Sequence, residues 1–271
     1  MSLTVPMQSV GLSAPLNGTR TAARTLDSTK ILRIENLTVS FDGFKAVENL
    51  SMTITEGELR VIIGPNGAGK TTLLDMICGK TRPTSGSIRF RDIELTRLPD
   101  FEIVRKGVGR KFQNPSIYED LTVGENLELS IPQVHGVWAS IMFKRTPQVK
   151  ARIGAIAEQV MLADQLRTKS GRLSHGQKQW LEIGMLLMQE PQLLLLDEPV
   201  AGMTAREREL TAELLRQVAR GRAMVVIEHD MGFVRSIAHT VTVLHQGKVL
   251  AEGPMEQVQA DPRVIDVYLG H

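Results

Sequence analysis

The chain has 271 residues, of which 42% are hydrophobic and 23% are charged, and this balance is typical of a soluble globular protein with a sizeable core. The 32 Lys and Arg residues against 30 Asp and Glu residues leave a formal charge of only +2, which argues against a nucleic-acid partner. The single cysteine, Cys78, excludes an internal disulfide bond, and no apolar run reaches the roughly 18 residues that cross a bilayer, so we expect a cytosolic protein.

The N-terminal part of the chain divides into a tail and the start of an ordered domain. Residues 1–30 are rich in Ser, Thr, Gly and Pro without a hydrophobic period, which predicts a disordered tail. Apolar and polar residues then alternate in 37–41 and 50–54, which predicts two half-buried strands on either side of a turn at Asp42–Gly43. The apolar run Leu59–Ile63 predicts a third strand that is buried on both faces.

The remainder of the chain predicts buried strands that alternate with helices. Short apolar runs occur at 193–196, 224–227 and 241–244, and apolar residues have helical spacing at 153–160 and 210–218. Such alternation is typical of a parallel sheet covered on both faces, so the fold class is α/β. Residues 87–94 join the early strands in a separate antiparallel layer, and residues 115–171 predict a mostly helical insertion.

A phosphate-binding motif, G-x-x-x-x-G-K-[ST], lies between the buried strand and a helical run that starts at Thr72. Its residues are Gly64, Pro65, Asn66, Gly67, Ala68, Gly69, Lys70 and Thr71, and with Thr72 they form the predicted nucleotide-binding set. The glycines let backbone N–H groups surround a phosphate, and the helix N-terminus adds partial positive charge. Lys70 can neutralise the β and γ phosphates and the Thr71 hydroxyl can bind Mg²⁺, so we expect ATP as the ligand.

Two adjacent acids follow the apolar run at 193–196. Asp197 and Glu198 therefore lie at the carboxyl end of a central strand, where open α/β sheets bind their ligands. Asp197 can hold the Mg²⁺ shell, and Glu198 is placed to polarise an attacking water. The alternative is that the two acids cap the following helix.

A short segment, Leu173-Ser174-His175-Gly176-Gln177, opens a helix with Ser174 as its N-cap, and alone it is weak evidence. This segment precedes the predicted strand that ends in Asp197 and Glu198, and a histidine, His229, follows another apolar run. Together with the phosphate-binding motif, these motifs and their order resemble those of the ATP-binding-cassette (ABC) ATPases. The resemblance extends from Ile31 to the C-terminus. It implies a P-loop NTPase fold with a RecA-like, mostly parallel sheet core, an antiparallel β layer and a helical insertion.

The resemblance also implies domain boundaries and residue roles. One ABC ATPase domain spans 31–271, with its β layer and core at 31–114 and 190–271 and a helical subdomain at about 115–189. The implied roles are adenine stacking for Phe41, contact with Mg²⁺ and water for Gln113, closure over the partner's γ-phosphate for Ser174, Gly176 and Gln177, and a hold on the γ-phosphate for His229. Glu198, His229, Lys70 and Gln113 are then the catalytic set, and Thr71, Gln113 and Asp197 the metal-binding set.

Two residues depart from the family pattern. The segment 173–177 corresponds to the signature segment of the family, and His175 replaces the usual glycine at its third position. We expect the change to be tolerated because Ser174 and Gly176 make the phosphate contacts. Thr204 stands where an aspartate is usual after the acidic strand, which calls into question the contact between subunits normally assigned there.

The resemblance further implies an ATP hydrolase that powers transport. With one cassette and no membrane segment, the chain needs a second cassette, of the same or a different kind, and transmembrane permease subunits. It would act at the cytoplasmic face of the cell membrane, served indirectly by a periplasmic solute-binding protein. The segments 198–203 and 243–270 resemble importers of branched-chain amino acids and of urea or short amides, and the run 173–185 resembles the urea-type branch most, which is our first expectation. The alternatives are a branched-chain amino acid importer and a lipid or lipopolysaccharide exporter.

Overall fold

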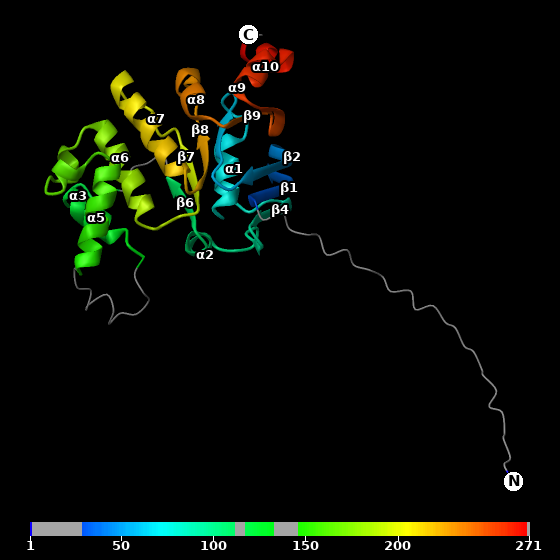
Figure 1. The fold of residues 1–271 in the computed structure, drawn as a ribbon. Helices are drawn as coiled ribbons and strands as arrows, with labels where there is room; N and C mark the ends of the chain where they lie inside the picture. The colour runs from blue at the N-terminus through cyan, green and yellow to red at the C-terminus, as the bar shows by residue number, and fades with distance from the viewer. Residues whose placement is uncertain (2–28, 112–116, 133–145, 270–271) are drawn as a thin grey trace.

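The computed structural model describes Met1 and residues 29–111, 117–132 and 146–269. Within these residues, six strands form a central sheet (Figure 1). In spatial order they are β10 (Lys248–Gly253), β9 (Thr240–His245), β3 (Leu59–Ile63), β8 (Ala223–Ile227), β7 (Leu193–Asp197) and β6 (Val108–Lys111). The β9–β10 pair is antiparallel and the other neighbours are parallel, which confirms the predicted α/β class.

Strands β7 and β8 are buried at every position, which explains their apolar runs at 193–196 and 223–227, and the equally buried β3 is apolar apart from Arg60, which pairs with Glu58. Alternate side chains of a strand point to opposite faces of a sheet. In β7, Leu194 and Leu196 accordingly belong to one hydrophobic cluster, whereas Leu193 and Leu195 belong to another. The helices of the first cluster are α3 (Val123–Leu129), α5 (Pro147–Gln159), α6 (His175–Leu187), α7 (Ala205–Ala219), α8 (Met231–Ile237), α9 (Met255–Ala260) and α10 (Pro262–Leu269).

The second cluster joins the central sheet to an antiparallel sheet through helix α1 (Lys70–Ile77). That sheet has the order β2 (Phe44–Thr55), β1 (Lys30–Phe41), β4 (Ser85–Phe90) and β5 (Ile93–Glu94). Asp42 and Gly43, both with positive φ, form the turn between β1 and β2, as predicted. The short helix α2 (Asp100–Arg105) and two 3₁₀ turns, Ala163–Gln165 and Ser170–Arg172, complete the elements.

Strand β6 is an element that the sequence pattern did not predict, because its last two residues are basic. Arg110 and Lys111 are nevertheless 8% and 4% exposed. Arg110 forms an ion pair with Asp75 on α1, and the ammonium of Lys111 lies 3.3 Å from Glu182 on α6. A buried charge is tolerated when it is paired. Because these partners are distant in the sequence, no local sequence pattern indicates the strand.

Some expectations fall outside the described residues. Residues 2–28 of the predicted tail and Gln113 are among them, so their predicted properties stay predictions. In the part of the chain that the structure covers, no helix has both the length and the apolar character that a bilayer crossing needs.

Candidate functional site

The phosphate-binding loop at residues 64–69 connects the carboxyl end of β3 to α1. Its backbone has positive φ at Gly64 (151°) and Gly69 (97°), where a side chain is unfavourable. A Cβ atom at Gly64 would lie 2.2 Å from the carbonyl oxygen of Leu244, and one at Gly69 would lie 2.4 Å from that of Ala46. The loop is therefore closely packed against the backbones of β9 and β2, and only glycine fits at these two positions.

The turn between β9 and β10 supports the loop from one side. Gly247 in this turn donates its N–H to the carbonyl of Ala68 in the loop (3.1 Å) and accepts the N–H of Glu48 on β2 (2.9 Å). Its φ is 75°, and a Cβ there would lie 2.8 Å from the carbonyl oxygen of Ala46. Gly247 thus joins the antiparallel sheet, the central sheet and the phosphate-binding loop at one point.

We predict that Gly247→Ala destabilises the fold and weakens ATP binding together, because the backbone must shift where the loop is held. A positive φ alone costs an alanine about 1 kcal/mol, and the close contact adds to this. Differential scanning fluorimetry should show a lower melting temperature. Gly154→Ala is the matched control, since nothing lies within 4 Å of a Cβ there and the site is inside helix α5. An unchanged ATP affinity in a destabilised Gly247→Ala variant would contradict the link to the loop.

Lys70 is the first residue of α1, and its ammonium lies against the loop that precedes it. It donates hydrogen bonds to the carbonyl oxygens of Gly64 (2.7 Å) and Pro65 (3.0 Å). Burial lowers the pKa of Lys70, and the negative charges of Glu198 and Asp197 oppose this shift. The predicted phosphate-binding cation and the predicted acids therefore lie close enough to interact.

Asp197 ends strand β7 with a carboxylate that is 2% exposed. Among the described residues, neither of its oxygens has a partner with standard hydrogen-bond geometry, although the Thr71 hydroxyl lies near enough to lower its pKa. Burial has the larger effect and raises that pKa. A buried carboxylate with free lone pairs beside a hydroxyl is a donor set that suits Mg²⁺, so these residues fit the predicted metal.

Sequence reasoning missed Arg110, which faces the same carboxylate from the neighbouring strand. Its guanidinium lies 4.0 Å from Asp197, and it contacts Asp75 on α1 and the sulfur of Cys78, the C-cap residue of that helix. The buried Cys78 therefore packs against a charged network, and not only against apolar side chains. No local signal could have identified Arg110, because the parallel pairing of β6 with β7 brings it to the site.

Glu198 and His229 come together where β7 and β8 end. Asp197 pairs with Ile227 across the two strands, and the N–H of Glu198 bonds to the Ile227 carbonyl (3.0 Å). As a result, the Nδ1 atom of His229 lies 3.6 Å from Oε1 of Glu198. Glu198 has a positive φ of 48°, which is a strained conformation for a side-chain-bearing residue.

The signature residues lie on a different element. Ser174 is the N-cap of α6, as predicted, and forms a capping box with Gln177, whose side chain bonds back to the Ser174 N–H (2.9 Å). The Ser174 hydroxyl also lies 3.4 Å from Glu207 on α7, and a Cβ at Gly176 would meet the same carboxylate at 2.3 Å. Figure 1 shows α6 on the far side of β7 from α1.

The two departures from the family pattern have local structural roles. The Nε2 atom of His175 lies 3.0 Å from the carbonyl oxygen of Ala201, so its ring contacts the segment that follows Glu198. Thr204 is the N-cap of α7 and accepts the N–H of Glu207 (3.3 Å). Threonine and aspartate are both good N-caps, so this exchange preserves the start of the helix.

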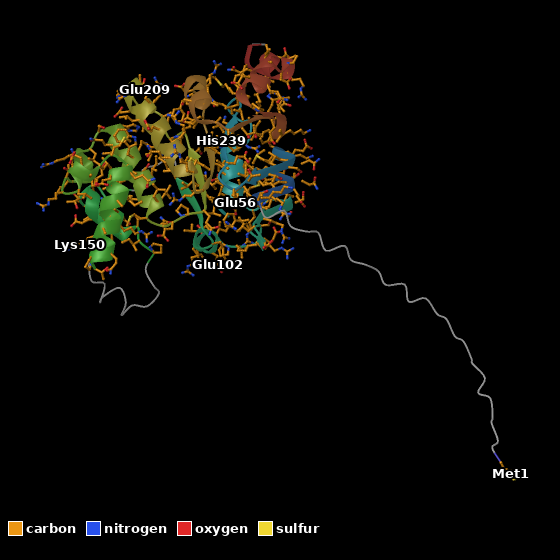
Figure 2. All side chains as sticks on the ribbon, in the orientation of Figure 1. Met1, Glu56, Glu102, Lys150, Glu209 and His239 are labelled. Atoms are coloured by element: carbon orange, nitrogen blue, oxygen red, sulfur yellow. The ribbon has the colours of Figure 1, made fainter. Side chains whose placement is uncertain are left out.

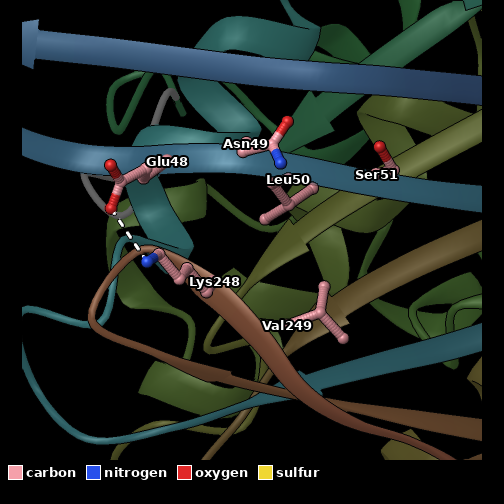
Figure 3. A pocket seen from close by; sticks show the side chains of 6 residues that line it. All are labelled: Glu48, Asn49, Leu50, Ser51, Lys248 and Val249. Atoms are coloured by element: carbon pink, nitrogen blue, oxygen red, sulfur yellow. Dashed lines mark ion pairs between the residues drawn. The ribbon is translucent and has the colours of Figure 1, made fainter.

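Two further features involve strands of the antiparallel sheet. Phe41, at the end of β1, is 48% exposed, so its ring face is available for stacking. A surface pocket of about 480 Å³ lies between β2 and β10 (Figure 3). Its lining residues are Glu48, Asn49, Leu50, Ser51, Lys248 and Val249, and Glu48 and Lys248 form an ion pair of 3.0 Å across it. None of these six residues belongs to the predicted nucleotide set.

The central strands therefore bring most of the predicted residues to one edge of the sheet. The adjacent strands β3, β8 and β7 supply the phosphate-binding loop, His229 and the acids Asp197 and Glu198. A half-buried cation, the loop glycines and a hydroxyl can bind a phosphate chain and its metal ion. A carboxylate beside an imidazole can orient a water for attack on phosphorus. The arrangement suits phosphoryl transfer to water.

Comparison with known proteins gives matches along most of the chain. Residues 47–201 match the family model described as ABC transporter, and residues 248–271 match the model described as branched-chain amino acid ATP-binding cassette transporter. The chain is 36% identical over 255 residues to the high-affinity branched-chain amino acid transport ATP-binding protein BraF of Pseudomonas aeruginosa, covering 90% of this chain and 99% of that protein. It is 34% identical over 252 residues to LivG of Escherichia coli, with the same coverage.

Solved structures of ABC transporter cassettes have the same fold. An ATP-binding cassette in its ADP conformation is 30% identical with a TM-score of 0.79, and the match covers 89% of this chain and 99% of that one. A nucleotide-free cassette is also 30% identical with a TM-score of 0.76, covering 89% of this chain and all of that one. These matches confirm the predicted P-loop fold with its α/β core and antiparallel layer.

Proposed function

The chain belongs to the ABC transporter family, whose cassettes hydrolyse ATP to drive transport, and from this we propose that it is the ATPase subunit of a branched-chain amino acid importer. The observation that carries the substrate proposal is at the C-terminus, where residues 248–271 match the model of branched-chain amino acid cassettes. The matches to the two relatives named for branched-chain amino acid transport cover 99% of the length of each relative.

Our first expectation, a urea-type importer, has weaker support. It depends on the run 173–185, which resembles the urea-type branch, and the names of the relatives do not include urea. The comparisons support the branched-chain alternative better, and urea or a short amide is the second candidate.

We propose the following roles within the site. The loop 64–69, Lys70 and Thr72 bind the phosphates of ATP, and Phe41 stacks on adenine. Thr71 and Asp197, with Gln113, would hold Mg²⁺, which neutralises charge on the phosphates when bound. Glu198 accepts a proton from the attacking water, and His229 holds the water and the γ-phosphate. Ser174, Gly176 and Gln177 act on the nucleotide of a second cassette.

We also infer the assembly from the family. A second cassette, of the same or a different kind, completes each nucleotide site, and transmembrane permease subunits provide the path for the solute. The chain then lies at the cytoplasmic face of the membrane, with a periplasmic binding protein delivering the solute to the permease. Within the chain, 31–114 and 190–271 form the catalytic core, and about 115–189 form a helical subdomain that faces the permease.

Uptake of labelled leucine and labelled urea tests the substrate proposal. The gene is deleted in the source cells and restored as wild type or as Glu198→Gln. We expect leucine uptake to fall to background and only the wild-type gene to restore it. Loss of urea uptake alone would favour the second candidate. Unchanged uptake of both solutes would contradict the importer proposal and favour the exporter.

A further inference from the structure

Glu228, the residue before His229, is a buried carboxylate without an assigned role. It is 1% exposed and follows the carboxyl end of strand β8. Burial raises its pKa, and hydrogen bonds from the backbone N–H groups of Val200, His229 and Asp230 oppose this shift. A buried carboxylate destabilises the folded state unless such donors compensate for its lost hydration. We therefore ask what Glu228 contributes to the site.

The two oxygens of Glu228 bind two different segments of the site. Oε1 accepts the N–H of Val200 at 3.2 Å, and Val200 lies two residues after Glu198. Oε2 accepts the N–H of His229 at 3.1 Å. One side chain therefore joins the segment after β7 to the segment after β8, which carry the proposed base and the proposed γ-phosphate contact.

The backbone around Glu198 needs such support because Glu198 has a positive φ of 48°. Its own N–H bonds to the carbonyl of Ile227, at the end of β8. The Val200 N–H, on the other side of Glu198, bonds to Glu228. Strained residues persist only where their surroundings hold them, and here both hydrogen bonds come from the end of one strand.

We propose that Glu228 is a positioning residue for ATP hydrolysis, which holds His229 and Glu198 in register with each other. The role requires two acceptors in one side chain, which a carboxylate has and an amide lacks. A glutamine would turn its NH₂ group toward one of the two backbone donors and break that contact. This inference rests on the proposed roles of Glu198 and His229 and does not depend on the transported solute.

The test compares Glu228→Gln with a matched buried glutamate. We expect Glu228→Gln to lower kcat for ATP hydrolysis by about 10- to 100-fold, since a small misplacement of reacting groups has effects of this size. The Kd for ATP should stay within about twofold of wild type, because the loop 64–69 and α1, which carry the main proposed phosphate-binding groups, lie outside the two segments that Glu228 joins. A lower kcat with an unchanged Kd for ATP is the result expected when a positioning residue is replaced.

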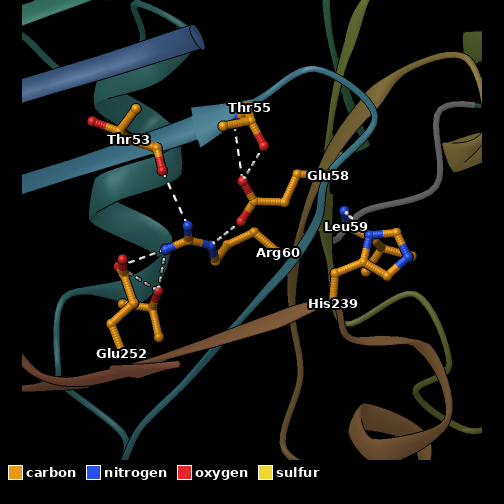
Figure 4. A network of polar contacts seen from close by, with 8 residues as sticks. Thr53, Thr55, Glu58, Leu59, Arg60, His239 and Glu252 are labelled. Carbon is orange, nitrogen blue, oxygen red and sulfur yellow. Dashed lines mark hydrogen bonds and ion pairs between the residues drawn. The ribbon is translucent and has the colours of Figure 1, made fainter. Parts of the chain in front are cut away.

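Glu58→Gln is the control for loss of stability alone. Glu58 is 9% exposed, accepts the Thr55 N–H at 2.9 Å and pairs with Arg60 at 2.6 Å (Figure 4). It precedes β3, at the opposite end of that strand from the phosphate-binding loop. We expect Glu58→Gln to lower the melting temperature and to keep kcat, when both variants are assayed well below their melting temperatures.

Three results would overturn the proposal: an unchanged kcat in Glu228→Gln, an equal loss of kcat in Glu58→Gln, or a parallel loss of ATP affinity. Should Glu228→Gln not fold, Glu228→Asp keeps the charge but is one methylene too short to reach both segments. It should then show the same loss of kcat with normal ATP binding, and wild-type kcat would reject the inference. Glu198→Gln runs in the same assay, and if it hydrolyses ATP normally, the proposed site roles themselves fail.

Discussion

Glu198→Gln should bind ATP as tightly as wild type, lose hydrolysis and remain as a cassette dimer in the presence of ATP. The amide keeps the size of the side chain but cannot accept the proton of the attacking water. General-base catalysis contributes about 10²- to 10⁴-fold to a rate, so we expect a loss of kcat in this range. Release of phosphate measures the rate, and size-exclusion chromatography with light scattering measures the mass of the complex.

The matched control for this variant is Glu209→Gln. Glu209 lies on α7, pairs with Arg206 at the surface and has a side chain that is 69% exposed (Figure 2). Its loss should leave the rate within about twofold of wild type. If Glu198→Gln hydrolysed ATP at nearly the wild-type rate, Glu198 would not be the base, and the strained backbone at this residue would need another explanation.

Lys70→Ala should lose nucleotide binding itself. The ammonium is half-buried beside the loop carbonyls and the acids, and its truncation removes the cation that faces the phosphates. Removing one partner of a buried charge contact costs about 2–5 kcal/mol, which corresponds to at least a roughly 30-fold rise in Kd for ATP. Isothermal titration calorimetry with ATP measures the change.

Lys80→Ala is the control for Lys70→Ala. Lys80 follows α1 and has a side chain that is 62% exposed near Asp75, so ATP affinity should stay within about twofold. An unaltered Kd in Lys70→Ala would reject the proposed role of the phosphate-binding loop. A matching loss in both variants would indicate a general effect of positive charge near α1.

The buried strands at 59–63, 193–196 and 224–227 and the meeting of the motif residues at one edge of the sheet could be predicted, because each depends on a short stretch of sequence. The segment Leu59–Ile63, apolar apart from Arg60, coincides with β3, and the acids directly follow the apolar run at 193–196. Since the carboxyl ends of parallel strands share one edge of a sheet, the order of motifs was enough to place Lys70, Asp197 and His229 together.

The residues that were missed depend on partners distant in the sequence. Arg110 is buried in β6 because Asp75 on α1 pairs with it, and Glu228 is buried because Val200 donates to it from another strand end. No single stretch of sequence distinguishes these residues from exposed charged side chains. The fold creates their environment, so the structure was needed to identify them.

The pairing of β3 has a consequence for biosynthesis. Leu59 pairs with Met224 on β8, and Ile63 with Val243 on β9, so both neighbours of this strand are translated long after it. The antiparallel sheet, whose strands are near one another in sequence, can form early on the ribosome, whereas β3 has no partner until most of the chain has emerged. Long-range pairings of this kind form slowly and leave apolar strand edges open to aggregation. We therefore expect truncated nascent chains that end before β8 to depend on chaperones for solubility.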